Sequence, residues 1–330
     1  MRPSAKAAIR YGMNLVAMVD RHAGRRAAIR TAARFVMTEA AKVPKLAVLL
    51  AAQRLRGGEE ERITWYSTEI VRALMELGVN VEPHSVDLDA FNDYVRQSSY
   101  PKNYAAGPMD DGGRREQKLL EYFVSLEFLE IRSSDVVIDV ASEWSMFPGV
   151  VRESIGATVY RQDLCYAAGI HADRIGGTAA RMPVPDGFAD KLVLHSAFGH
   201  FEGVADTEFV GEAWRVLKPG GTLCILPLFM SDRYAILTDP LVNRRGVVWD
   251  EGARIVERLW WHNRFGRIYD AAALNRRVLT PGRQFLTTIY RITNAPLAHS
   301  AAKLDFALVM RKPNAESGAA SSRGGDPMPG

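Results

Sequence analysis

The sequence predicts an α/β fold over residues 132–312, in which helices cover both faces of a doubly wound, mostly parallel β-sheet. The first observation is a series of short β-branched runs after Ile131 with helical segments between most of them, which is typical of a parallel sheet. The second is the wholly apolar run Val136-Val137-Ile138, which suits a strand buried on both faces. The third is the turn Pro219-Gly220-Gly221, which ends a helix and starts a strand.

The elements follow in order along the chain. We expect a basic, amphipathic helical arm over 1–56 and a helical lead-in or cap over 57–131, with helices at 64–77 and 115–129. After Pro313, Ser, Gly, Ala and Pro dominate, and 313–330 is predicted to be disordered. The strands of the main domain are predicted at 136–138, 157–160, 191–194, 222–226, 285–292 and 304–310.

The composition is that of an ordinary soluble protein of 330 residues, 47% hydrophobic and 24% charged. No apolar run approaches the roughly 20 residues that cross a bilayer. Cys165 and Cys224 form no C-x-x-C pair, so we expect neither a zinc site nor any other metal site. A secretory signal is not recognisable, and the expected location is the cytoplasm.

The positive charge gathers at the start of the chain. Residues 1–56 hold twelve Lys or Arg against two acids, Asp20 and Glu39. A solvated face on packed helices explains this, and an interfacial helix at the inner membrane face is the alternative. Nucleic-acid binding is disfavoured because few aromatic side chains lie between the arginines.

One segment carries a specific motif. Residues 212–223 read Glu-Ala-Trp-Arg-Val-Leu-Lys-Pro-Gly-Gly-Thr-Leu. This string resembles the E-x-x-R-V-L-K-P-G-G segment before the fifth strand of class I S-adenosylmethionine-dependent methyltransferases. Residues 182–190, Met-Pro-Val-Pro-Asp-Gly-Phe-Ala-Asp, are similar to the passage that leads into the fourth strand of that family. The resemblance spans about 180 residues, with its landmarks in family order.

The resemblance implies a Rossmann-like sheet of seven strands and S-adenosylmethionine as the cofactor. It places Asp163, after the second strand, on the ribose hydroxyls, since a carboxylate can accept hydrogen bonds from both. It places the loop after the first strand, from Asp139 to Ser145, under the methionine portion, and Thr178 near adenine. The implied cofactor-binding residues are Asp139, Ala141, Ser142, Glu143, Asp163, Thr178 and Ala179.

The cofactor loop departs from the family pattern D-x-G-x-G-x-G. Ala141, Glu143 and Ser145 stand at the three glycine positions, where glycine would allow close approach and special dihedral angles. Glu143 adds bulk and negative charge beside the expected amino-acid end of the cofactor. Thr178 stands where the family often has an acid. These departures leave two interpretations, a divergent cofactor site or a fold that has lost its cofactor.

Methyl transfer often needs a base for the proton of the acceptor. His195, at the end of the predicted fourth strand, and His200, five residues later, are the candidate catalytic residues. The alternative is that one or both hydrogen-bond the backbone at a crowded strand end. The segment between the predicted fifth and sixth strands, from Tyr234 to Tyr269, is rich in aromatic and arginine residues. In the family this region often closes over the acceptor, and the alternative is that its tryptophans pack the N-terminal helices onto the sheet. Asp250 and Glu251 are predicted to be solvated surface charges.

The sequence therefore predicts a cytoplasmic methyltransferase that acts on a small or carbohydrate-type acceptor. The alternative is a non-catalytic binding or scaffold protein that keeps the fold, and Glu143 is the feature that favours it. A nucleic-acid methyltransferase is a weaker alternative and predicts binding that falls steeply with salt. A dehydrogenase that uses NAD is weaker still, because it too needs the missing glycines.

Overall fold

The structure is a computed structural model that describes residues 68–98, 114–143, 145–259, 261–298 and 303–314. The predictions for the basic arm (1–56) and for residues 315–330 of the tail lie outside the described residues, as do 57–67 and 99–113 of the lead-in.

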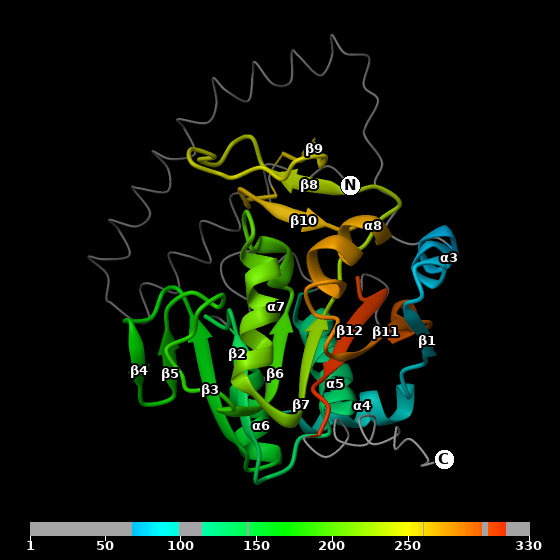
Figure 1. Cartoon of the computed structure of the whole chain (residues 1–330). Helices are drawn as coiled ribbons and strands as arrows, with labels where there is room; N and C mark the ends of the chain where they lie inside the picture. Colours follow the sequence, from blue (N-terminus) through cyan, green and yellow to red (C-terminus); the bar gives the residue numbers. More distant parts are fainter. Residues whose placement is uncertain (1–67, 99–113, 144, 260, 299–302, 315–330) are drawn as a thin grey trace, which may run out of the picture.

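A single large sheet forms the centre of the described molecule (Figure 1). Its strand order is β1-β11-β12-β7-β6-β2-β3-β5-β4. Strands β3, β2, β6 and β7 run parallel to one another, whereas β12 is antiparallel to both β7 and β11. The strands are β1 (Asn80–His84), β2 (Val136–Val140), β3 (Thr158–Asp163), β4 (Gly169–His171), β5 (Arg174–Gly176), β6 (Ala189–His195), β7 (Leu217–Leu226), β11 (Leu286–Ile292) and β12 (Phe306–Arg311).

The predicted number of seven strands is wrong, because the sheet has nine. The six strands predicted by residue range are present as β2, β3, β6, β7, β11 and β12, whereas β5 lies in no predicted range and β1 and β4 extend the sheet at its two edges. Strand β1 contains Pro83 and is largely exposed, so it lacks the alternation that marks a half-buried strand. Strand β4 has three residues and pairs with β5 across a short connection, which is too short for a pattern.

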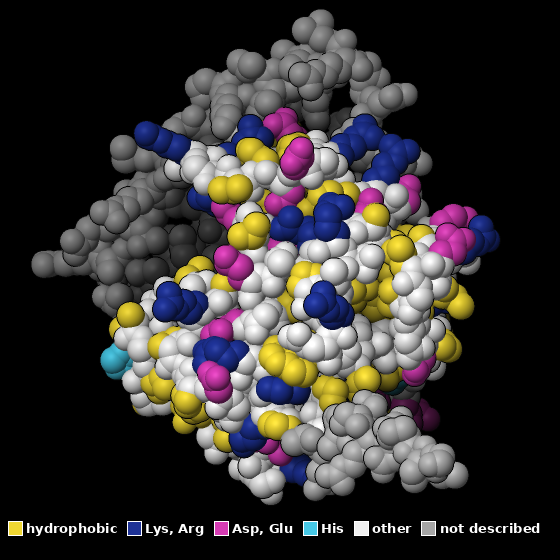
Figure 2. Space-filling view, in the orientation of Figure 1, with side chains coloured by type: hydrophobic (Ala, Val, Ile, Leu, Met, Phe, Trp, Pro, Cys, Tyr) yellow, Lys and Arg dark blue, Asp and Glu magenta, His cyan; other side chains and the backbone are white. Residues whose placement is uncertain are grey.

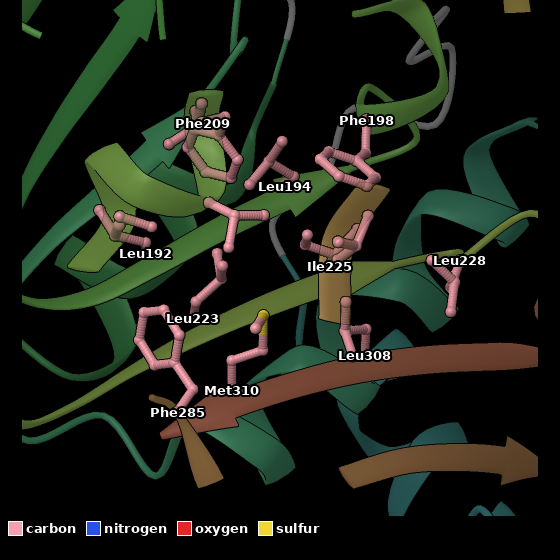
Figure 3. Packing of buried hydrophobic residues seen from close by; sticks show 14 of the residues in the cluster. Leu192, Leu194, Phe198, Phe209, Leu223, Ile225, Leu228, Phe285, Leu308 and Met310 are labelled. Carbon is pink, nitrogen blue, oxygen red and sulfur yellow. The ribbon is translucent and has the colours of Figure 1, made fainter. Parts of the chain in front are cut away.

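Helices cover both faces of the sheet, as predicted (Figure 1). Alternate residues of the central strands point to opposite faces: Leu192 and Leu194 of β6 belong to the apolar cluster that includes Phe209 of α7, whereas Val193 belongs to the cluster that includes Leu119 of α5. Figure 3 shows the first cluster from close by. The helices are α3 (Thr68–Glu76), α4 (Leu88–Gln97), α5 (Arg114–Leu129), α6 (Phe147–Ser154), α7 (Ala205–Val216), α8 (Ala271–Leu274) and α9 (Ala295–Ala298), with the short turns η1 (Phe198–His200) and η2 (Asn275–Leu279).

The described part of the predicted helical lead-in contains a strand as well as helices. Helices α3, α4 and α5 lie within it, and α4 begins where the Asp87 carboxylate accepts hydrogen bonds from the amides of Asp89 and Ala90. Between α3 and α4, β1 joins the main sheet in parallel with β11, with Asn80 opposite Thr288. The sheet therefore includes chain from before residue 132.

A second, smaller sheet lies beyond one end of the main sheet (Figure 1). It has the order β10-β8-β9 and is formed by β8 (Ala235–Thr238), β9 (Arg254–Glu257) and β10 (Gly266–Ile268). These strands are inserted between β7 and β11, and they lie at the end where β3, β6 and β7 finish. We call residues 230–270 the cap, because they stand over the edge at which α/β sheets bind ligands.

Candidate functional site

The order of the strands fixes where a ligand site is expected. Strand β2 lies between β3 and β6 and runs parallel to both, and the chain proceeds from β2 outward first on one side and then on the other. The crevice beyond the carboxyl ends of such strands is the binding position of open α/β sheets. Asp139, Asp163 and His195 lie at the ends of these three strands.

The loop after β2 has a glycine-like backbone although it lacks the glycines. Ala141 has a φ of 54°, in the left-handed region that a residue with a Cβ rarely adopts. Such a conformation costs roughly 1–2 kcal/mol and persists only where the surroundings enforce it. Ala141 therefore has the backbone conformation that glycine would supply at the first glycine position of the family loop.

Two residues of β3 enforce this path. The Gln162 side-chain carbonyl accepts a hydrogen bond from the Ala141 amide at 3.3 Å, and the Gln162 main-chain carbonyl accepts one from Ser142 at 3.0 Å. The Gln162 amide group donates to the Gly177 carbonyl at 2.6 Å, so this buried side chain joins the loops after β2 and β5. Sequence reasoning missed Gln162. The signal that could have found it is an amide side chain directly before the expected Asp163.

Asp163 holds the same loop from its other side. One carboxylate oxygen accepts a hydrogen bond from the Glu143 amide at 3.1 Å, and the other accepts one from the Cys165 amide at 3.0 Å. Each oxygen retains a further lone pair for a ligand. Partial burial and the Asp163 carboxylate raise the pKa of the Cys165 thiol to about 11, and the Glu143 carboxylate contributes to the same shift. Carboxylate charge therefore surrounds this end of β3.

The loop after β5 brings Thr178 and Ala179 to the same edge of the sheet. Gly177 has a φ of 140°, and the Thr178 hydroxyl, which lies on an exposed residue, accepts a hydrogen bond from the Ala180 amide at 3.2 Å. Ala179 is buried in the apolar cluster on the α7 face. Thr178 is therefore the accessible member of this pair.

His195 is enclosed at the end of β6. Its side chain is 3% exposed, and the rings of Tyr122 and Phe147 lie 4.7 Å from its ring centroid. The Ser125 hydroxyl gives its only proton to the Tyr122 carbonyl, so the His195 Nε2 must donate to Ser125 Oγ, at 3.0 Å. His195 is thus held by α5 and carries a proton on Nε2.

Asp139 lies beside the other nitrogen of this ring. The distance from His195 Nδ1 to Asp139 Oδ1 is 3.5 Å, and both side chains are almost fully buried. Nδ1 and the second oxygen, Asp139 Oδ2, have no hydrogen-bond partner among the described residues. Buried polar atoms without partners are rare and often mark a place for a bound group or water.

Helix α5 supplies further polar groups that sequence reasoning missed. Glu121 is fully buried and accepts hydrogen bonds from Ser196 Oγ at 2.7 Å and Lys118 Nζ at 2.6 Å. Ser196 directly follows His195 and has a φ of 57°. In the sequence, Lys118 and Glu121 fit the solvated face of an amphipathic helix. Only the three-dimensional structure shows that they lie beside the carboxyl end of β6.

His200 is the accessible histidine of the two. It is exposed, and its Nδ1 donates to the Phe265 carbonyl of the cap at 2.7 Å. Within the described ranges no residue bonds to its Nε2. In the neutral ring that nitrogen carries the lone pair and can accept a proton.

A buried ionic cluster joins the cap to the main domain. Arg267 and Asp206 have fully buried side chains, with Nη1 3.1 Å from Oδ2, and Arg267 also makes a two-point bond to Asp250 at 2.6 and 3.0 Å. Arg277 donates to both oxygens of Asp206, and Tyr269 donates to one of them. The prediction that Asp250 is a solvated surface charge is wrong, because its carboxylate is 2% exposed and neutralises Arg267.

The described ranges offer neither a cluster of metal-binding side chains nor a membrane-spanning helix. They contain no group of three or more His, Cys, Asp or Glu side chains placed to hold a metal ion. They also contain no helix with the length and apolar character needed to span a bilayer.

Comparison with known proteins gives a family for part of the chain. Residues 153–225, from α6 to β7, match the family model of a methyltransferase domain. No curated protein matches this chain.

Three solved structures illustrate the likeness. A candidate methyltransferase from Bacillus halodurans is 25% identical over 32% of this chain and 45% of its own, with a TM-score of 0.27, so the chain spans under half of its length. The PH0226 protein of Pyrococcus horikoshii is 15% identical over 67% of this chain and 99% of its own, with a TM-score of 0.42. The 1,6-didemethyltoxoflavin-N1-methyltransferase of Burkholderia thailandensis, solved with its substrate and S-adenosylhomocysteine, is 14% identical over 77% and 93%, with a TM-score of 0.37.

The strand order and the matched segment agree with the motif at residues 212–223. The chain therefore carries a segment that matches a methyltransferase domain, within a Rossmann-like α/β sheet.

Proposed function

We propose that this protein is an S-adenosylmethionine-dependent methyltransferase that acts on a small, polar acceptor, including carbohydrate-type molecules. The observation that carries the proposal is the preformed loop after β2. Its Ala141 backbone has the left-handed conformation that a glycine would supply, and Gln162 and Asp163 hold it there. A chain that no longer needs a ligand at this place would gain stability by relaxing that conformation.

The residues present fit the cofactor. Asp163 keeps free lone pairs for ribose hydroxyls while it binds two backbone amides, and Thr178 offers an exposed hydroxyl at the next strand end. Asp139 Oδ2, which has no hydrogen-bond partner in the described part of the chain, lies at the end of β2, where a hydrogen-bond donor would satisfy it. Ala141, Ser142 and Ala179 shape the floor, and Glu143 places a carboxylate toward the cationic end. When bound, S-adenosylmethionine supplies an electrophilic methyl group.

The two histidines have different roles in this proposal. His200 Nε2 accepts the proton that the acceptor loses. The other ring nitrogen, Nδ1, donates its proton to the Phe265 carbonyl, so the lone pair of the neutral ring is on Nε2. His195 is too deeply buried to reach an acceptor, and the Ser125 contact fixes its ring beside Asp139. His195 is therefore a positioning residue and His200 the base.

The cap is the proposed acceptor side of the site. Figure 2 shows basic and acidic side chains intermixed at the cap end of the visible face. Arg244 is paired with Glu257 at 2.8 Å and Arg264 with Glu202 at 2.6 Å, so these arginines are neutralised. Mixed polar and aromatic groups suit a polar, weakly charged acceptor better than a polyanion.

Calorimetry of the full chain with S-adenosylmethionine and S-adenosylhomocysteine tests the proposal. We expect binding in the micromolar range by the wild type and by Asp173→Ala, an exposed acid elsewhere on the sheet paired with Arg152. We expect at least tenfold weaker binding by Asp163→Ala, with unchanged circular dichroism. Absence of binding at millimolar cofactor would favour the alternative of a non-catalytic binding protein.

A further inference from the structure

The loop that carries His200 is in direct contact with the cap. Residues 198–203 follow β6, and their contacts include the Phe265 carbonyl, which accepts from His200 Nδ1 at 2.7 Å. Gly199 lies so near β10 that a Cβ on it would stand 2.9 Å from the Arg267 carbonyl oxygen. The loop therefore rests directly on the backbone of β10.

The Arg267 side chain contacts both the loop that carries His200 and the residue of the cap to which His200 is bonded. Arg267 Nη1 donates to the Phe201 carbonyl at 2.6 Å, and its Nη2 donates to the Gly203 carbonyl at 2.8 Å. Its guanidinium group also lies 5.1 Å from the centroid of the Phe265 ring, the residue whose carbonyl accepts from His200. Arg267 thus contacts the chain just after His200 and the partner of His200 in the cap.

The position of Arg267 is itself strongly determined. Its side chain is fully buried between the carboxylates of Asp206, at the start of α7, and Asp250, in the cap. A planar guanidinium group can make the two-point bond to Asp250 and reach two carbonyls at once, whereas an ammonium group cannot.

We propose that Arg267 is a positioning residue that sets the tautomer and orientation of His200 by seating residues 198–203 on β10. The inference rests on the proposed function for the role of His200 as a base. It adds that cap and base form one unit, so that an acceptor bound by the cap meets Nε2 in a fixed place. Burial of a charged cluster here thereby serves the site in addition to the fold.

Ring-nitrogen NMR of the 15N-labelled full chain tests the proposal without an acceptor. His200→Gln identifies the His200 signals among the seven histidines. In the wild type at neutral pH we expect a protonated Nδ1 and an unprotonated Nε2, because a hydrogen bond to a carbonyl selects the tautomer. A wild-type ring with the opposite tautomer would overturn the proposal at once.

Two variants then disturb the contact between residues 198–203 and β10 in independent ways. Arg267→Lys keeps the charge but loses the two-point geometry, and Gly199→Ala keeps the whole cluster but pushes the loop away from β10. We expect both to lose the single-tautomer signal of His200 and to show a mixture. Arg244→Lys, within the cap, and Gly211→Ala, whose Cβ would meet nothing within 4 Å, are the matched controls and should keep it.

The outcomes separate this inference from the proposed function. If Arg267→Lys does not fold, Gly199→Ala decides alone. If folded variants retain the wild-type tautomer, Arg267 has only a structural role and the inference is wrong. If the wild type fails to bind S-adenosylmethionine but the tautomer responds as expected, the positioning by Arg267 stands and the proposed function fails.

Discussion

Replacing Asp206 by Asn should destabilise the protein far more than replacing an exposed aspartate. The Asp206 carboxylate is fully buried and receives bonds from Tyr269 at 2.7 Å and from Arg277 at 2.7 and 2.9 Å, with Arg267 3.1 Å away. Asparagine keeps the shape and one acceptor oxygen, so the change mainly leaves the fully buried Arg267 and the partly buried Arg277 with the single carboxylate of Asp250. Breaking a buried ion pair by removing one partner costs about 3–5 kcal/mol. We expect the lower end, about 3 kcal/mol, because Arg277 is 14% exposed and can turn toward water.

Urea denaturation followed by fluorescence measures this loss. With a slope of about 3 kcal/mol/M, the unfolding midpoint should fall by roughly 1 M. Asp173→Asn is the control: Asp173 lies 2.5 Å from Arg152, but both side chains are more than a third exposed, so its loss should cost no more than about 1 kcal/mol. Equal midpoints for the two variants would refute the view that the buried cluster holds the cap to the main domain.

Three further outcomes are expected. Burial alone would raise the pKa of Asp250, but hydrogen bonds from Arg267 and Tyr234 outweigh it and lower that pKa. Its stabilisation should therefore be present above about pH 4 and be lost as the pH falls through the lowered value, and acid titration of Asp250→Asn should lack this component. Cys165, with its raised pKa of about 11, should react with iodoacetamide at pH 8 at least about 10-fold more slowly than a free thiol. Asp163→Asn should speed the reaction, and an unchanged rate would show that Asp163 is not a cause of the raised pKa. Ala141→Gly should raise the unfolding free energy by about 0.5 kcal/mol, since relief of left-handed strain outweighs the added chain entropy, and calorimetric unfolding would expose a loss instead.

The central fold could be predicted because its strands are apolar on both faces. The runs that became β2, β6 and β7 are buried along most of their length, and burial on both faces leaves a clear pattern in the sequence. The edge strands leave no such pattern. Asn80–His84 is mostly solvent-facing and became a strand because β11 offered a free edge, which depends on chain some 200 residues away.

The candidate site was predictable only as positions along strands. Asp139, Asp163 and His195 stand at strand ends, as the family resemblance implied, and their roles are proposals. The enclosure of His195 could not be foreseen, because Ser125 lies 70 residues away and belongs to a helix whose packing the sequence does not reveal. For the same reason Asp250 looked like a surface charge until its partner, 17 residues later, was placed beside it.

The pairing of β1 with β11 also affects how the protein is made. Asn80 donates to Thr288 and Val86 donates to Asn294, in each case across 208 positions of sequence. During synthesis β1 leaves the ribosome long before its partner strand exists, and its edge stays unpaired until almost all of the domain has been translated. Contacts between distant parts of a chain form slowly, and unpaired edges promote aggregation. The completed sheet thus depends on a late event that a truncated chain, lacking β11 and β12, could not reproduce.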